Sequence, residues 1–186
     1  FVTVNIFVLD EDPQVAAQMM CDKHVVKMIV ESAQMLSTAH RVLDGEQYTE
    51  LSANNRRIKR WKSRHKLFEE MLYKASFVGH PCTQWVMENN KNYYWLVNHA
   101  FELCKEYTRR YKKIHKTEDM IQLIRFRKPA NIPIADFITP FAQAMPEEYK
   151  NEDAVKAYRA YYLGEKTAFA TWKNSETPYW YEEVLV

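Results

Sequence analysis

Four side chains near the start of the chain have the types and spacing for acid–base or amine chemistry. Lys23, His24, Lys27 and Glu31 recur at intervals of three and four residues, so on a helix they lie together along one edge. A histidine exchanges protons near neutral pH, and a partly desolvated lysine can stabilise charge or attack an electrophilic carbon. We predict that these four residues are catalytic, with Glu31 and His24 handling protons. The simpler alternative is a surface Lys27–Glu31 pair beside a hydrogen-bonded histidine.

A second group of polar residues lies among aromatic residues farther along the chain. One helix edge carries Trp95 and His99, and a later helix carries Arg159 and Lys166. Charge combined with flat side chains suits a pocket that clamps an extruded base. The predicted substrate-binding residues are Asp22, His80, Trp95, His99, Arg159, Tyr162 and Lys166. An aromatic stripe alone is more typical of core packing.

A basic tract spans residues 56–66 and holds seven lysines and arginines together with one tryptophan. Cations that bind phosphates and an aromatic ring that stacks on bases are typical of a nucleic-acid contact. The predicted DNA-binding residues are Arg56, Arg57, Lys59, Arg60, Trp61, Lys62 and Arg64. The alternative is a solvated loop.

Two short patterns could in principle hold zinc. Cys21 with His24, and His80 with Cys82, would supply four ligands. Neither spacing is that of a zinc knuckle, and buried thiols with a loop histidine explain the residues more simply. We therefore predict no metal and no cofactor. The sequence also lacks a glycine-rich phosphate loop, a G-x-S-x-G elbow and an H-E-x-x-H helix, which argues against P-loop kinases, α/β-hydrolases and zincins.

The composition bounds the class of protein. The chain has 186 residues, of which 47% are hydrophobic, and a net charge of only +2. It is therefore long enough to bury a core, but its overall charge does not mark it as a polyanion binder. No apolar run is long enough to cross a membrane. Three cysteines without a pairing pattern, and no signal-peptide pattern, predict a cytoplasmic protein, in the host cytoplasm if a phage encodes it.

Hydrophobic periodicity predicts mostly helices. Residues 4–9 read as a short strand or an extended arm, and a helix capped by Asp10 or Asp12 runs from Pro13 to about residue 43. Its buried face should hold Val26, Ile29, Val30, Ala33 and Leu36. Residues 46–66 form a basic insertion of loop or frayed helix. Further helices are expected at 67–77, 89–115, 117–126 and 153–172, followed by an aromatic tail. The predicted fold class is mainly α, a compact single-domain helical fold over residues 1–186.

Several segments resemble a family of phage and bacterial proteins. The shared patterns are Asn-Ile-Phe-x-Leu-Asp at 5–10, Asp-x-His-x-x-Lys-Met at 22–28, His-Pro-Cys at 80–82, Trp-x-x-Glu at 85–88, Tyr-Arg-x-Tyr-Tyr at 158–162 and a tryptophan-rich tail at 172–180. More distantly, the layout is similar to that of the phage pyrimidine-dimer DNA glycosylases, which are small, all-α repair enzymes with an N-terminal arm and a charged first helix.

The resemblance implies a chemistry. In that family the N-terminal amine attacks the sugar carbon, a glutamate on the first helix assists, basic neighbours grip the DNA backbone, and strand cleavage follows through a Schiff base. Lys23, His24 and Lys27 match the charged cluster, so His24 stands at the place of the carboxylate and Glu31 is the nearest glutamate.

These observations predict an enzyme that acts on a base in double-stranded DNA. The first hypothesis is a DNA glycosylase, with or without lyase activity, on a damaged or modified pyrimidine. The second is a transferase that adds an amino acid or amine to a base in phage DNA, which would need a small-molecule co-substrate. The third is a DNA-binding accessory protein without catalysis.

Overall fold

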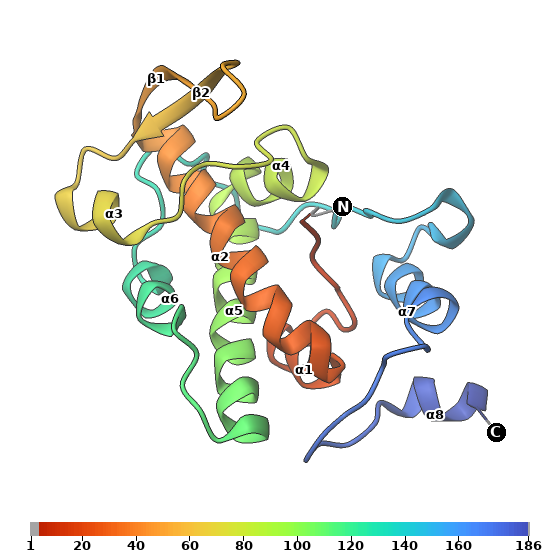
Figure 1. Cartoon of the computed structure of the whole chain (residues 1–186). Helices are drawn as coiled ribbons and strands as arrows, with labels where there is room; N and C mark the ends of the chain where they lie inside the picture. Colours follow the sequence, from red (N-terminus) through yellow and green to blue (C-terminus); the bar gives the residue numbers. More distant parts are fainter. Residues whose placement is uncertain (1–3, 186) are drawn as a thin grey trace.

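The computed structural model describes residues 4–185, and it describes side chains as far as residue 183. Its centre is a pair of long helices, α2 (Asp22–Asp44) and α5 (Asn90–Tyr111), which pack against each other. Helix α1 (Pro13–Met19) packs on α5 beyond the start of α2 (Figure 1). Asp12 caps α1 by accepting hydrogen bonds from the backbone N–H groups of Gln14 and Val15, as the sequence predicts.

The predicted single helix over 13–43 is wrong, because the chain breaks between α1 and α2. Met20 and Cys21 have extended backbones. The fully buried Arg110 donates to the carbonyl oxygens of Gln18 and Met20, which are the groups that a continuous helix would need for its own hydrogen bonds. Arg110 also pairs with Asp22 at the first position of α2. Of the predicted buried face, Ile29, Ala33 and Leu36 are buried, whereas Val26 is 38% exposed and its neighbour Val25 is buried.

Within the described part of the chain, residues 4–9 are assigned to no strand, so the arm alternative is confirmed and the strand alternative is wrong. Val4, Ile6, Val8 and Leu9 are buried. The arm passes between α2 and α7 (Ala154–Glu165) (Figure 1). It therefore forms part of the core that joins the two halves of the chain.

The basic insertion is a β-hairpin rather than a loop or frayed helix. Strands β1 (Glu46–Leu51) and β2 (Arg57–Lys62) pair antiparallel at one end of α2 (Figure 1). The intervening turn has Asn55 at a positive φ of 58°, a conformation that asparagine tolerates. The buried Arg41 of α2 holds the insertion by donating to the carbonyl oxygen of Trp61 and to Glu69.

Two predicted helices are shorter than expected, for tertiary reasons. Helix α3 (Lys66–Met71) ends early because Ser37 and Thr38 of α2 bind the backbone N–H groups of Tyr73 and Ser76. Helix α7 ends at Glu165 because the segment around Thr171 is bound at the start of α2. The remaining elements are α4 (Pro81–Glu88), α6 (Glu118–Arg125), the 3-10 turn η1 (Glu147–Tyr149) and α8 (Tyr179–Leu185). The prediction of a mainly helical fold is confirmed.

One cluster of buried apolar residues includes members from Val4 to Tyr181. It draws on the arm, on α1, α2, α4, α5, α6 and α7, and on the tail. Within the described part of the chain, no helix is both long and apolar enough to cross a membrane.

Three buried histidines make the stability of this fold depend on pH. Burial lowers the pKa of His24 to about 3 and that of His40 and His99 to about 4, with nearby lysines adding to the effect at His24. When the pH falls below 6.5, the ordinary histidine pKa, these residues take up protons in the unfolded chain. In the folded chain they stay neutral until the pH is near 4 or lower. Stability is therefore present above pH 6.5 and is lost as the pH falls toward 4.

We expect the free energy of unfolding to fall by about 2 kcal/mol per buried histidine between pH 7 and pH 5. Urea unfolding at several pH values measures this. The matched variant is His40→Gln, which keeps a polar partner for Tyr93 and should show a shallower pH dependence than the parent. Equal slopes for the two proteins would contradict the assignment.

Candidate active site

The beginning of the arm lies directly against a carboxylate on α2. The backbone N–H of Asn5 donates to Glu31 Oε2 at 3.2 Å, and Glu31 is only 4% exposed. The Asn5 side chain is itself fixed, since its Nδ2 donates to the carbonyl oxygen of Ala144 and its Oδ1 accepts from the Tyr158 hydroxyl. The sulfur of Cys82 lies 3.7 Å from the same Oδ1. Four distant segments therefore hold the arm at Glu31.

The environment of Glu31 changes how readily its carboxylate takes up a proton. Burial raises the pKa of the Glu31 carboxyl, although Lys27 and the Asn5 N–H oppose the shift. Lys27 Nζ lies 3.7 Å from Oε1. Among the described residues, Oε1 has no hydrogen-bond partner. A buried carboxylate with a raised pKa and one unsatisfied oxygen is suited to take a proton from a neighbouring group.

Three lysines surround His24 beside this carboxylate. Burial and the charges of Lys166, Lys27 and Lys23, in that order, lower the pKa of His24. Lys23 Nζ lies 4.6 Å from the centre of the Phe169 ring, and Lys166 Nζ lies 4.6 Å from that of Tyr161. The result is a positively charged surface with aromatic rings, which suits phosphates and flat bases.

The expectation that His24 exchanges protons near neutral pH is wrong. With a pKa of about 3, the ring is neutral at physiological pH. Its Nδ1 is hydrogen-bonded to the hydroxyl of Tyr162, and its ring stacks on Phe7 of the arm at 4.3 Å. His24 and Tyr162 thus hold the arm in place against α2.

Asp22 and Arg159 bind other parts of the chain. Asp22 accepts from Arg110, from the Thr171 hydroxyl and from the backbone N–H of Lys173, which fastens the chain after α7 to the start of α2. Arg159 donates to the carbonyl oxygen of Leu9 and lies near Asp10. Their hydrogen-bonding capacity is largely used within the protein, and a contact with substrate stays a prediction.

Trp95, His99 and His80 are likewise bound to backbone. Trp95 Nε1 donates to the carbonyl oxygen of Glu11, and His99 Nδ1 is bonded to that of Pro13. His80 caps α4 by accepting from the backbone N–H of Cys82. These contacts position the start of α1 and α4. The predicted role of the three side chains in substrate binding has no further support from their surroundings.

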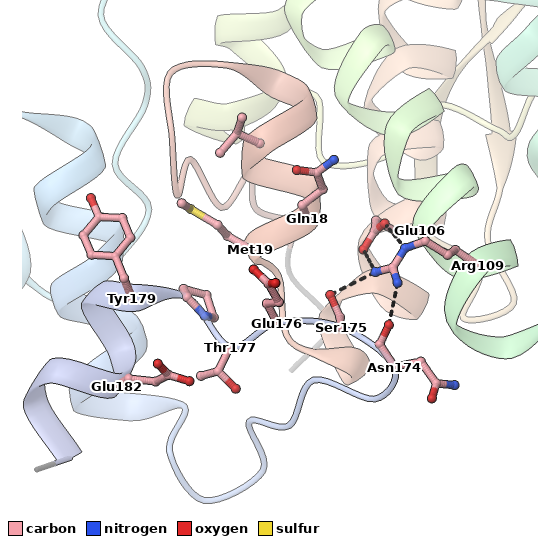
Figure 2. A pocket seen from close by; sticks show the side chains of 12 residues that line it. Gln18, Met19, Glu106, Arg109, Asn174, Ser175, Glu176, Thr177, Tyr179 and Glu182 are labelled. Carbon is pink, nitrogen blue, oxygen red and sulfur yellow. Dashed lines mark hydrogen bonds and ion pairs between the residues drawn. The ribbon is translucent and has the colours of Figure 1, made fainter.

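The pocket in Figure 2 lies away from Glu31, between α1, α5 and the tail. Its volume is about 820 Å³, and it is lined in part by Glu106, Glu176 and Glu182. Arg109 forks onto Glu106 and also binds Asn174 and Ser175 (Figure 2). Its glutamates make this pocket a poor match for a polyanion such as DNA.

The two cysteine–histidine pairs considered for zinc do not come together. Within residues 4–185, no group of three or more His, Cys, Asp or Glu side chains is placed to hold a metal ion. Burial also raises the pKa of Cys82 to about 12, so this thiol keeps its proton. A protonated thiol is a poor ligand for zinc.

The contacts that join Asn5, Cys82 and Tyr158 beside Glu31 were not predicted from the sequence. Each of these residues lies in one of the sequence patterns described above, since Asn5 opens Asn-Ile-Phe, Cys82 closes His-Pro-Cys and Tyr158 opens Tyr-Arg-x-Tyr-Tyr. The structure brings these three patterns together beside Glu31. The sequence alone does not show that these three segments, which are far apart in the chain, lie next to one another.

Comparison with known families agrees with this geometry. Residues 4–119 match the family model described as pyrimidine dimer DNA glycosylase. The chain belongs to this family. The predicted resemblance is thereby confirmed, and at the family level the protein is a DNA-acting glycosylase. No curated protein and no solved structure matches the chain.

Membership of this family suggests why the contact between Asn5 and Glu31 matters. The family resemblance implies a nitrogen at the start of the arm that works with a glutamate on the first long helix. In this chain the carboxylate beside that nitrogen is Glu31, which lies on the same helix edge as His24, two turns later. The matched segment contains Asn5, Lys27 and Glu31.

A buried carboxylate that is ionised at neutral pH should lower the free energy of unfolding. Because burial raises the pKa of Glu31, ionising this residue opposes folding, and the stability present at low pH is lost as the pH rises through the folded-state pKa. We expect Glu31→Gln to raise the melting temperature by about 2–4 °C at pH 8, and to lose this advantage below pH 4.

The matched control is Glu69→Gln. Burial alone would raise the pKa of Glu69, but the Ser63 N–H and Arg41 lower it overall. This control should therefore lower the melting temperature at pH 8. Scanning calorimetry measures both proteins, and a Glu31→Gln variant less stable than the parent at pH 8 would contradict the account of the site.

Proposed function

We propose that the protein cleaves the N-glycosyl bond of a damaged or modified pyrimidine in double-stranded DNA, with Glu31 as proton acceptor and Lys27 as attacking amine. The observation that carries the proposal is the buried Glu31 carboxylate, with the Asn5 nitrogen on one oxygen and the Lys27 amine near the other. A carboxylate with an adjacent amine is the minimum set for amine-driven glycosyl cleavage.

Lys27 is chosen over the arm for a chemical reason. The Asn5 backbone N–H acts as a hydrogen-bond donor to Glu31, whereas the proposed step needs an amine with a free lone pair. Lys27 carries a primary amine 3.7 Å from Glu31 Oε1, and its side chain is 53% exposed. The amine can therefore reach a sugar outside the protein while its proton passes inward to Glu31.

The proposed step balances in atoms and charge. Lys27 gives a proton to Glu31, and its nitrogen lone pair forms a bond to the sugar C1′. The bond between C1′ and the base breaks, and the base leaves with that electron pair and takes the proton that Glu31 holds. The nitrogen then passes a proton to the sugar ring oxygen as the bond between C1′ and that oxygen breaks, which leaves a protonated Schiff base on Lys27. The Glu31 carboxylate takes a proton from C2′, and the 3′ phosphate leaves with the electron pair of its bond to C3′, which breaks the strand.

The surrounding residues support this step without taking part in bond changes. Lys23 and Lys166 lie on either side of His24 and supply positive charge for the phosphates that flank the target. Phe169 and Tyr161 offer aromatic faces beside these lysines. An extruded base requires such surfaces because it loses its stacking partners in the duplex.

A transferase that decorates a base is the second candidate. It is favoured by His24, which stands where the resemblance places the family's carboxylate and which is a neutral ring here. The same Glu31 and lysines would then deprotonate an incoming amine or amino acid while the glycosyl bond stays intact.

Borohydride trapping tests the proposed chemistry. Sodium borohydride reduces a Schiff base to a stable bond, so the parent should form a covalent adduct with a duplex carrying a pyrimidine dimer or an abasic site. Lys27→Ala should reduce the adduct by at least about a hundredfold, in keeping with the loss of a nucleophile.

Lys23→Ala is the matched control, because it removes the same charge one helical turn away. It should weaken DNA binding but keep the adduct at saturating protein. An adduct of full yield in Lys27→Ala would place the nucleophile elsewhere. A parent that gives no adduct and no abasic sites would contradict the glycosylase proposal.

A further inference from the structure

The hairpin sorts its charges onto two faces. Residues that are directly opposite in an antiparallel pair lie on the same face, and successive residues alternate. The register places Leu51 opposite Arg57, and Thr49 opposite Lys59. One face therefore holds Arg57, Lys59 and Trp61 with Leu51, Thr49 and Gln47, and the other holds Ile58, Arg60 and Lys62 with Glu50, Tyr48 and Glu46.

The two faces differ in charge and in their contacts with the protein. Both carboxylates of the strands lie on the second face, where Glu50 pairs with Arg60 at 2.8 Å and Glu46 lies opposite Lys62. Arg60 also donates to the carbonyl oxygen of Ala75, which ties this face to the body of the protein. The second face is thus largely neutralised and partly covered.

The first face has no carboxylate. Arg57 and Lys59 are exposed, and within the described part of the chain neither forms an ion pair. Leu51 beside them is 64% exposed. Two adjacent unpaired cations on one face of a ribbon repel each other, unless an anion binds between them or alongside them.

We propose that the face formed by Arg57, Lys59 and Trp61 is a docking surface for the phosphate backbone of duplex DNA, outside the catalytic site. The opposite face, although it carries Arg60 and Lys62, does not contact DNA. The basic tract is a continuous run of positive residues in the sequence, but on the hairpin only one of its two faces would bind DNA.

The distance from the catalytic site fits a duplex. Lys27 precedes Gly45, where α2 ends, by 18 residues. At about 1.5 Å per residue this is about 27 Å along the helix axis and about five full turns, so Gly45, where the hairpin begins, lies at about the same angle around α2 as Lys27. A rise of about 3.4 Å per base pair makes that separation about eight base pairs, less than one turn of DNA.

This inference rests on the DNA-acting function proposed above, but its test does not require catalysis. Affinity for an undamaged duplex is measured against salt for the parent, for Arg57→Ala with Lys59→Ala, and for Lys62→Ala with Arg64→Ala. The last variant is the matched control, because it also removes two positive charges, both beside Glu46. Circular dichroism melting checks that each variant is folded.

The first double variant should raise the Kd about tenfold or more at 0.1 M salt and lower the slope of log K against log salt by about 2. The control should change the Kd by less than about twofold. Equal losses of DNA affinity in the two double variants, or no loss in either, would overturn the proposal. Binding to polyglutamate is measured in the same way, and a first double variant that loses affinity for this acidic polypeptide but not for DNA would also overturn it. Borohydride trapping on lesion DNA reports the glycosylase proposal separately, so one can fail while the other stands.

Discussion

The guanidinium of Arg110 fixes where helix α2 begins, and the position of the candidate site follows from that start. Arg110 is fully buried, and it binds Asp22, Glu106 and the carbonyl oxygens of Gln18 and Met20. A buried cation without partners is costly, so these acceptors are needed together. Asp22 in turn fastens the segment after α7. One side chain therefore sets the axial position of α2 relative to α1, α5 and the last third of the chain.

That placement turns a charged helix edge into a site with distinct parts. His24 faces the arm and is neutral, because burial and three lysines lower its pKa. Glu31, two turns later, is also buried, but its pKa moves upward, in the direction of a base. Lys27 lies between them and is open to solvent. Polar residues on one helix edge thus differ in charge state and in accessibility, because they are buried to different extents.

Much of this arrangement was predictable from local sequence. The middles of both long helices followed from hydrophobic periodicity, and Asp12 and Asp153 followed from capping rules. The hairpin was not predictable, because its strands are dense in charge. Its turn also lacks the Asn-Gly or Asp-Gly pair that marks a two-residue turn.

The wrongly predicted helix ends and the unpredicted site contacts have the same physical cause, which is contact between residues far apart in the chain. The break before Cys21 depends on Arg110, about ninety residues away, and the end of α7 depends on Asp22. At the site, Lys27 and Glu31 were predicted from their spacing. The contacts of Asn5 with Glu31 and with Tyr158 were not predicted, because they exist only after the arm has packed between α2 and α7.

Glu31 is proposed to carry out proton transfer in N-glycosyl cleavage, and intact-mass spectrometry of the DNA can test this role. A duplex with one pyrimidine dimer is incubated with the parent and with Glu31→Gln, and each strand is weighed before and after hot alkali. The account predicts a strand break at the lesion with the parent and an intact strand with Glu31→Gln. A strand that gains mass without becoming alkali-labile, or equal cleavage by both proteins, would contradict it.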